Sequence, residues 1–291
     1  MSLSKTDLIY DVGMHNGDDT AYYLHRGYRV IGIEANPALV DDIRRRFRSE
    51  IDACKLIVLN VAINSYEGEC DFWISKEDLG LSSCSESFAK RYGGDCSQIR
   101  VRCARFDSIL AEYGMPSYLK IDIEGSDLLC LEGLKSFAEI PQYLSIESTA
   151  GTDTVDRLYD LGYREFKLIS QFDLVPIEDP PAELALKLEC IRDLLNSRRL
   201  PVRILRKLGG RLILERWRKS LVRTARYRDG WYFSVESTGP FGELSCGQWV
   251  SRERIREIYL QYKMRLEQGE DSIFWFKGHG DTFWADFHAS Y

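Results

Sequence analysis

The order of apolar runs along the first two thirds of the chain restricts the fold more than any other feature. Short runs rich in Val, Ile and Leu alternate there with helical stretches, an order that builds a parallel sheet covered by helices. The expected strands are residues 8–12, 29–34, 55–63, 69–74, 98–102, 118–123, 143–147 and 165–170. The expected helices are residues 18–26, 37–50, 106–113, 127–137 and 152–161. We therefore predict a doubly wound, mostly parallel α/β fold of the Rossmann-like type.

Composition excludes several classes of protein. With 291 residues, 44% of them hydrophobic and 29% charged, the chain can bury a core and is neither disordered nor collagen-like. A net charge of −6 argues against a nucleic-acid partner. The eight cysteines form no CxxC pair, so no metal site is predicted from them. The sequence has no signal-peptide pattern and no long apolar run, and we expect a cytoplasmic protein.

The pattern of alternation divides the chain into three parts. Residues 1–175 form the predicted core, and residues 176–230 form a helical, basic insertion before the last strand. Residues 231–291 contain a glycine-rich loop, an amphipathic helix and a last aromatic stretch. We expect this C-terminal part to return to the core sheet and to supply part of the site that binds the substrate, the acceptor of the reaction.

A glycine turn follows the first expected strand, in the segment LIYDVGMHNGDDT. The strand ends on Asp11, and Gly13 and Gly17 allow a ligand to lie against the backbone. The spacing is GxxxG rather than GxGxxG, and an acid at the strand end could pair with an ammonium group. This suits the methionine end of S-adenosylmethionine better than a pyrophosphate. Glu34 ends the next strand, where a doubly wound fold binds a ribose diol.

The segment LKIDIEG carries the candidate bases. Strand alternation would place Lys120, Asp122 and Glu124 on one face, where the two carboxylates raise each other's pKa and one serves as a general base. Solvated carboxylates or a pair with Lys120 remain the simpler alternative. A divalent cation shared with Glu147 or Asp107 is also open.

His288 is a second candidate base. It lies in the last aromatic stretch, where a final strand would place it on the same face as Asp286. A lone histidine is more often a structural residue.

Three blocks together resemble a known family. The segments DVGMHNGDDT, VIGIEANP and LKIDIEGSD are similar, in order and spacing, to the hallmark blocks of the FkbM-family S-adenosylmethionine-dependent methyltransferases. The resemblance covers roughly residues 8–170. It implies a class I methyltransferase fold, S-adenosylmethionine as cofactor, and methyl transfer most often to a hydroxyl oxygen of a sugar, polyketide or other secondary metabolite.

The resemblance also assigns cofactor contacts. It places around the methionine portion Asp11, Gly13, Asn16, Gly17 and Thr20, and His15 lies in the same turn. It assigns the ribose hydroxyls to Glu34 with Asn36 beside it, and places Asn60 and Ala62 beside the adenine. Ser82 and Ser83 fall where related sequences have a loop near the reaction centre.

Residues 198–228 are strongly basic, with 12 Lys and Arg against the single acid Glu215. Leu205, Leu208 and Leu212 stand at helical spacing, as do Leu214, Trp217 and Leu221. The segment could lie on an anionic membrane surface, dock a phosphorylated or lipid-linked glycan, or pack its leucines against the core as a solvated helix.

The sequence thus predicts a methyltransferase that uses S-adenosylmethionine and a small-molecule or glycan acceptor. Two alternatives stay open: a nicotinamide-dependent oxidoreductase, and a non-catalytic cofactor-binding module tethered to a membrane by the basic insertion.

Overall fold

The computed structural model describes residues 7–228, 230–235, 237–267 and 284–291, with side chains up to residue 264 in the third of these ranges. The chain forms two compact units. The first contains residues 1–163 and 289–291, and the second contains residues 164–288. Residues 164–175, which were expected to be part of the core, lie in the second unit.

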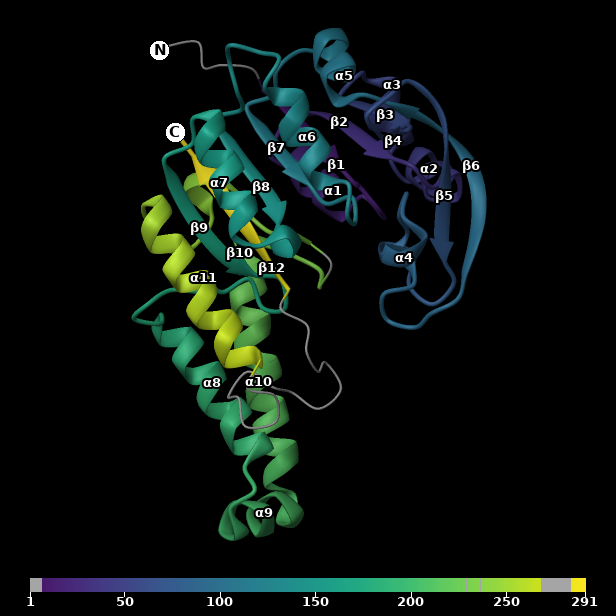
Figure 1. Ribbon diagram of the computed structural model, residues 1–291. Helices are drawn as coiled ribbons and strands as arrows, with labels where there is room; N and C mark the ends of the chain where they lie inside the picture. The colour runs from purple at the N-terminus through teal and green to yellow at the C-terminus, as the bar shows by residue number, and fades with distance from the viewer. Residues whose placement is uncertain (1–6, 229, 236, 268–283) are drawn as a thin grey trace. The chain divides into compact units, whose positions relative to one another are not determined.

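The first unit is built on five parallel strands. Their order is β3 (Leu56–Asn60), β2 (Arg29–Glu34), β1 (Leu8–Val12), β7 (Tyr118–Ile121) and β8 (Tyr143–Glu147) (Figure 1). All of β1 and β7 is buried, as expected for strands covered on both faces. The strand order reverses at β1, because β2 and β3 lie on one side of it and β7 and β8 on the other. The mostly parallel α/β fold is confirmed.

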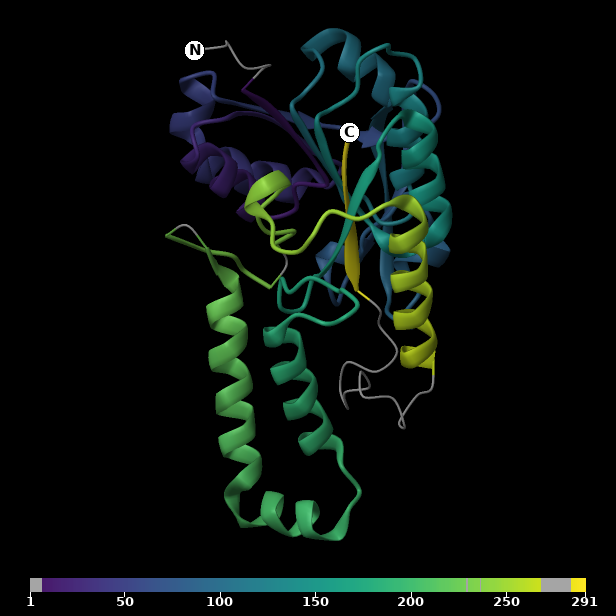
Figure 2. The ribbon, with the colours of Figure 1, turned by 90° about the vertical axis from the view of Figure 1, so that its left-hand side faces the viewer.

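Helices cover both faces of this sheet. The helices that follow the first strands are α1 (Asp18–His25), α2 (Pro37–Arg46) and α3 (Arg48–Asp52). The helices that follow the later strands are α5 (Phe106–Tyr113), α6 (Asp127–Leu134) and α7 (Thr152–Leu161). In Figure 2, α1 and α2 lie on one face and α6 and α7 on the other. Right-handed crossovers produce this division when strand order reverses.

A second, three-stranded sheet interrupts the alternation. Its order is β4 (Ala62–Ile63), β6 (Cys96–Ala104) and β5 (Gly68–Ser75), with the short helices η1 (Leu79–Leu81) and α4 (Glu86–Ala89) between β5 and β6. The prediction of one strand over residues 55–63 is wrong, because β3 ends at Asn60 and the chain changes sheet. The second sheet has its own apolar cluster, which includes Ala62, Phe72 and Cys103.

Three further boundaries differ from the predictions. The helix expected over residues 37–50 is broken at Phe47, whose ring packs beside Gly17. The helix expected over residues 127–137 ends at Leu134. The strand expected over residues 118–123 ends at Ile121, so alternation does not extend to Glu124.

The second unit contains β9 (Glu165–Ser170) and the first four residues of the neighbouring strand β12 (Ala285–Ser290). Helix α11 (Arg252–Glu267) places Tyr259 against Phe287 of β12, with ring centroids 5.4 Å apart. The second unit also contains a short hairpin, formed by β10 (Tyr227–Arg228) and β11 (Trp231–Tyr232), and the 3-10 turn η4 (Gly242–Leu244). Part of the predicted aromatic stretch, residues 272–283, lies outside the described residues.

A long helical hairpin forms the rest of the second unit. Helix α8 (Glu183–Asn196) runs out, α9 (Leu200–Leu205) and the turn η3 (Arg206–Gly210) form the far end, and α10 (Arg211–Arg226) returns (Figure 2). Among the described residues, no helix has the length and apolar character needed to cross a bilayer.

Candidate active site

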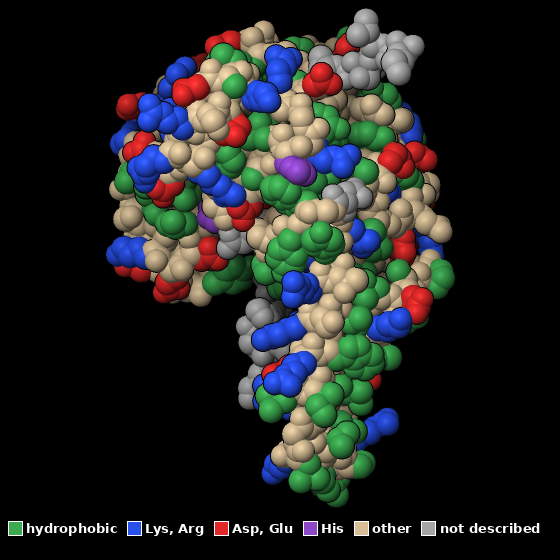
Figure 3. Space-filling view, turned by 180° about the vertical axis from the view of Figure 1, so that it is seen from behind, with side chains coloured by type: hydrophobic (Ala, Val, Ile, Leu, Met, Phe, Trp, Pro, Cys, Tyr) green, Lys and Arg blue, Asp and Glu red, His purple; other side chains and the backbone are tan. Residues whose placement is uncertain are grey.

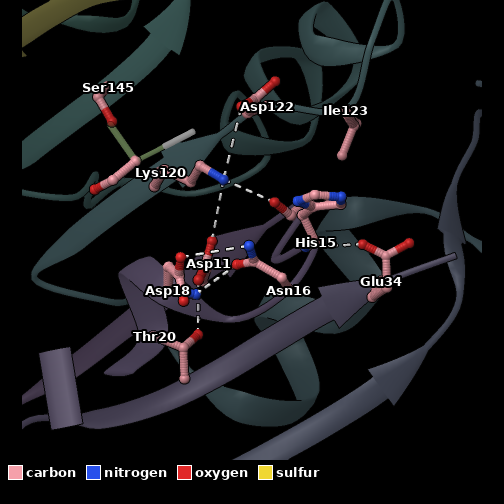
Figure 4. A network of polar contacts seen from close by, with 12 residues as sticks. Asp11, His15, Asn16, Asp18, Thr20, Glu34, Lys120, Asp122, Ile123 and Ser145 are labelled. Atoms are coloured by element: carbon pink, nitrogen blue, oxygen red, sulfur yellow. Dashed lines mark hydrogen bonds and ion pairs between the residues drawn. The ribbon is translucent and has the colours of Figure 1, made fainter. Parts of the chain in front are cut away.

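The carboxyl ends of the parallel strands carry a group of acidic side chains. Asp11 stands near the end of β1, Glu34 ends β2 and Glu147 ends β8, while Asp122 and Glu124 follow β7. Doubly wound sheets bind ligands at this edge, at the point where strand order reverses. In this unit that point lies between β1 and β7, and Figure 4 shows the polar network around it.

Lys120 and Asp11 form a buried ion pair at this point. They face each other across the parallel pair β1 and β7, with Lys120 Nζ 3.3 Å from Asp11 Oδ1. Thr20 Oγ1 donates a 2.7 Å hydrogen bond to Asp11 Oδ2. Both side chains of the ion pair are almost completely buried, and Asp11 is 0% exposed. The ammonium group beside Asp11 is therefore the chain's own Lys120.

The Lys120 ammonium also connects the ends of the two strands. Its Nζ donates a 2.7 Å hydrogen bond to the carbonyl oxygen of Gly13 and lies 3.8 Å from Asp122 Oδ2. Burial alone would lower the pKa of Lys120, but the carboxylates of Asp11 and Asp122 outweigh it and raise that pKa. Lys120 is consequently a fixed positive charge that holds the turn after β1 against β7.

Glycine is required at position 13 because the backbone of Asp122 passes very close to it. Its φ is +81°, and a Cβ built there would stand 1.7 Å from the carbonyl oxygen of Asp122. The space beside the turn is thus filled by protein backbone rather than left for a ligand.

We expect Gly13→Ala to lower the free energy of unfolding by about 2–4 kcal/mol, because β1 and β7 must separate to admit the methyl group. Urea denaturation would measure the loss. Gly27→Ala is the matched control, since Gly27 has a similar φ of +89° and a Cβ added there would meet nothing within 4 Å. Equal losses in the two variants would refute the steric explanation.

Glu34 is held in place by the backbone of two turns. Its Oε2 accepts a 3.0 Å hydrogen bond from the His15 backbone N–H, and its Oε1 accepts a 2.8 Å bond from that of Asn36. Burial raises the pKa of Glu34 to about 7, although these two hydrogen bonds oppose the shift. Each oxygen keeps a second lone pair for a ligand hydroxyl.

The three predicted asparagines shape the surrounding turns. The Asn16 side chain accepts from Asp18 N–H at 2.9 Å at the start of α1. Asn36 Oδ1 caps α2 by accepting from Ala38 N–H at 3.1 Å. Asn60 Nδ2 donates to the carbonyl oxygens of Glu34 and Ala35 at 2.9 and 3.0 Å, and so orients the end of β2. Ala62 is placed differently, because its side chain is buried in the core of the second sheet.

Glu124 projects from a strained turn that Asp127 stabilises. Glu124 has a φ of +53° and Gly125 one of +96°, both in the left-handed region. Asp127, the first residue of α6, accepts 3.0 Å hydrogen bonds from the N–H groups of Ile123 and Gly125. Because Asp127 holds the residues on either side of Glu124, it fixes the direction of the Glu124 side chain.

The segment around α4 surrounds Glu124. Arg91 Nη2 lies 2.6 Å from Glu124 Oε2, and Ser83 Oγ donates a 2.7 Å hydrogen bond to the Glu124 carbonyl oxygen. The Arg91 guanidinium is stacked 4.1 Å from the Phe88 ring centroid. Burial, followed by the charge of Asp122, raises the pKa of Glu124 to about 8 against the opposing charge of Arg91.

Asp122, Glu124 and Glu147 come together although only the first two are close in sequence. One carboxylate oxygen from each lies within 4.8 Å of the others. Such a group could bind a cation, but acidic clusters also exist without one. Asp107, the other acid considered for such a site, instead pairs with Arg105 at the start of α5.

A hollow of about 190 Å³ lies beside this acidic group. It is lined by Phe88, Gly125, Asp127, Leu128, Ile146, Glu147, Thr149, Ala150 and Thr154. The carboxylate of Glu147 and the turn that carries Glu124 thus border the same space. Its lining combines apolar side chains with the acids Asp127 and Glu147.

His288 belongs to β12 in the second unit and is 1% exposed. Asp286 shares its strand face, as predicted, and accepts a 2.6 Å hydrogen bond from Gln171 Nε2. Burial and the nearby charge of Lys167 lower the pKa of His288 to about 3. An imidazole with this pKa is neutral at pH 7 and a weak base. Its role as a second base stays a prediction.

Sequence reasoning missed two residues of the site. Arg91 lies 33 positions before Glu124, and no local pattern connects the two. Phe88 fills the space beside Gly125, where a Cβ would meet its ring at 2.8 Å. The family resemblance, which places Ser83 in a loop near the reaction centre, was the one indication in the sequence that this segment lies near the site.

The profile of the methyltransferase FkbM domain matches residues 11–165, which is more than half of the chain. The chain belongs to this methyltransferase family. No curated protein matches the sequence significantly.

Two solved structures are similar over part of their length. The C-terminal domain of precorrin-6Y C5,15-methyltransferase from Rhodobacter capsulatus shares 12% identity at a TM-score of 0.33, with 55% of this chain and 64% of that one covered. Precorrin-6Y C5,15-methyltransferase from Geobacter metallireducens GS-15 shares 13% identity at a TM-score of 0.34, with 58% and 71% covered. The chain thus spans slightly less than two thirds of the first.

Proposed function

We propose that this FkbM-domain methyltransferase uses S-adenosylmethionine to methylate a hydroxyl oxygen of a sugar, glycan or secondary metabolite. The observation that carries the proposal is the group of carboxylates at the switch point of the sheet. Glu34 is available there for a diol, and Glu124 stands beside a hollow with a pKa raised to about 8.

The donor set fits the proposed cofactor at the end of β2. A carboxylate at this position in a doubly wound fold accepts hydrogen bonds from a ribose diol, and Glu34 is oriented by two backbone N–H groups. Asp11 contributes indirectly, since it is occupied by Lys120 and Thr20 and thereby fixes the turn over residues 13–17. When bound, S-adenosylmethionine supplies an electrophilic methyl group.

Glu124 is the preferred base for the acceptor hydroxyl. Transfer of the methyl group would break its bond to the cofactor sulfur and leave S-adenosylhomocysteine as the second product, and the Glu124 carboxylate would accept the O–H proton that the acceptor loses. Arg91 remains beside this carboxylate, 20% exposed, and holds its direction. Asp122 lies between Glu124 and Lys120 and contributes negative charge that keeps the Glu124 pKa high.

The proposal predicts a cofactor-dependent gain in stability. S-adenosylhomocysteine at about 100 times its Kd should stabilise the fold by about 2.7 kcal/mol, which raises the thermal midpoint by about 5 °C or more. NAD at the same concentration should leave the midpoint unchanged. Differential scanning fluorimetry measures both.

A matched pair of variants locates the ligand. Glu34→Ala should remove most of the shift with S-adenosylhomocysteine, whereas Glu69→Gln, at an exposed acid on β5, should retain it. A shift with NAD and none with S-adenosylhomocysteine would replace the proposal by the oxidoreductase alternative.

A further inference from the structure

The base of the helical hairpin is firmly attached within the second unit. Arg226, the last residue of α10, is 0% exposed, and its guanidinium donates to the carbonyl oxygens of Phe172 and Val235, each at 3.3 Å. Arg192 of α8 forms a 2.9 Å ion pair with the buried carboxylate of Asp173. The end of α10 and the middle of α8 are therefore anchored within the second unit.

Apolar packing continues this attachment along the first turns of the hairpin. Ala225 of α10 and Leu188 of α8 are buried together with Val175. Leu221 and Val222 pack against this cluster. The predicted packing of the leucines against a core is thus correct for Leu221.

At the far end of the hairpin, the residues that the structure describes do not bury the apolar side chains in this way. Residues 200–217, which we term the apolar tip, expose seven large apolar side chains. They are Leu200 (66% exposed), Ile204 (50%), Leu205 (59%), Leu208 (80%), Leu212 (64%), Ile213 (69%) and Trp217 (47%). Packing against the core is therefore wrong for Leu205, Leu208 and Leu212. Soluble surfaces seldom concentrate large apolar side chains in this way unless they bind something.

Positive charge surrounds the apolar tip. Within residues 198–228 eight basic side chains are exposed, namely Arg198, Arg199, Arg203, Lys207, Arg211, Arg216, Lys219 and Arg223. The single acid among residues 198–228, Glu215, forms a 2.7 Å ion pair with Arg211. Figure 3 shows hydrophobic side chains gathered at the far end of the hairpin with Lys and Arg side chains beside them.

We propose that the apolar tip docks on an anionic lipid bilayer. Its apolar side chains enter the boundary between headgroups and acyl chains, and the surrounding Arg and Lys side chains contact lipid phosphates. Charge complementarity selects this occupant. A nucleic acid or acidic peptide would satisfy the cations but leave the leucines and Trp217 in water. The proposal is independent of the methyl-transfer chemistry.

The fold suits this role because the most exposed apolar residue stands at the outermost turn. Leu208 precedes Gly209, whose φ of +97° reverses the chain between α9 and α10. The exposed Leu205 lies before this reversal, and the exposed Leu212 and Ile213 lie after it. A turn between two helices can insert these side chains without crossing the membrane.

Flotation of the full-length protein with vesicles tests the proposal. Vesicles of phosphatidylcholine with about one third phosphatidylglycerol should carry the protein upward at low salt, and vesicles of phosphatidylcholine alone should not. Binding should weaken as salt is raised, because the charges of the lipid surface are screened. Free glycerol phosphate, added as a competitor, should not release the protein, which separates a bilayer surface from a soluble phosphate ligand.

Two variants with matched controls assign binding to the tip. Leu208→Ser with Leu212→Ser should lower vesicle affinity about tenfold or more, whereas Leu260→Ser with Met264→Ser, on an exposed face of α11, should not. Arg203→Gln with Lys207→Gln should lower it by about 30-fold, at about fivefold per charge. Arg44→Gln with Arg48→Gln, on α2 and α3, is the control for net charge.

Two results would overturn the proposal. One is unchanged flotation of the tip variants, with circular dichroism showing that they are folded. The other is a concentration-dependent dimer, seen by sedimentation, that the Leu208→Ser and Leu212→Ser pair dissociates, because a second copy would then cover the tip.

Discussion

Glu124→Gln is expected to lower kcat by about 100- to 10,000-fold, the range that a general base contributes. An amide keeps the size of the side chain but cannot accept the hydroxyl proton. The affinity for S-adenosylhomocysteine, measured by calorimetry, should stay unchanged, because the proposed cofactor contacts come from β1 and β2. Turnover would be followed with an acceptor found by screening hydroxylated sugars and metabolites.

The pH dependence of the parent protein provides a second signature of the same base. With a pKa of about 8, Glu124 is mostly protonated at pH 7, so activity should rise as the pH increases through about 8. Arg91 lowers this pKa. Arg91→Met should therefore move the rising limb to higher pH, whereas Arg100→Met, which removes an exposed partner of Asp71, should not move it.

Either of two observations would exclude Glu124 as the base. One is full turnover in Glu124→Gln. The other is a rising limb that keeps its position in Arg91→Met. His288 would become the base to examine next, through His288→Gln, if the limb lies well below pH 7.

The local pattern of the sequence was sufficient to predict where much of the site lies. The expected bounds 8–12, 29–34 and 143–147 coincide with β1, β2 and β8, because the inner residues of each run are buried. Glu34 and Glu147 end two of these strands, and Asp11 is the last residue but one of the third. The acids at these strand ends were therefore placed correctly. Because these strands are parallel, the acids at their carboxyl ends lie at the same edge of the sheet.

Contacts between distant segments were not predictable. Asp11 looks free in sequence, and only the pairing of β1 with β7 places Lys120 opposite it. Strand alternation could not locate Glu124, because the chain leaves the strand after Ile121 and turns with positive φ. Leucine spacing similarly indicated helices in this segment, but it did not show the break at Leu208 and Gly209 or that Leu208 is 80% exposed.

The buried pair of Lys120 and Asp11 should dominate the stability of the site. Lys120→Met removes the ammonium and leaves the Asp11 carboxylate buried without its countercharge, which costs about 3–5 kcal/mol. The thermal midpoint should fall by about 10 °C. Lys76→Met is the control, because its ion pair with Asp95 is exposed to solvent and should contribute little to stability.

The double variant Asp11→Asn with Lys120→Met separates loss of charge balance from loss of packing. The amide introduced by Asp11→Asn would keep an acceptor for Thr20 but carry no charge, so the double variant should recover most of the stability that Lys120→Met loses. Urea denaturation of the parent, both single variants and the double variant completes the cycle. A double variant no more stable than Lys120→Met alone would mean that Lys120 stabilises the turn chiefly through its hydrogen bond to the Gly13 carbonyl oxygen.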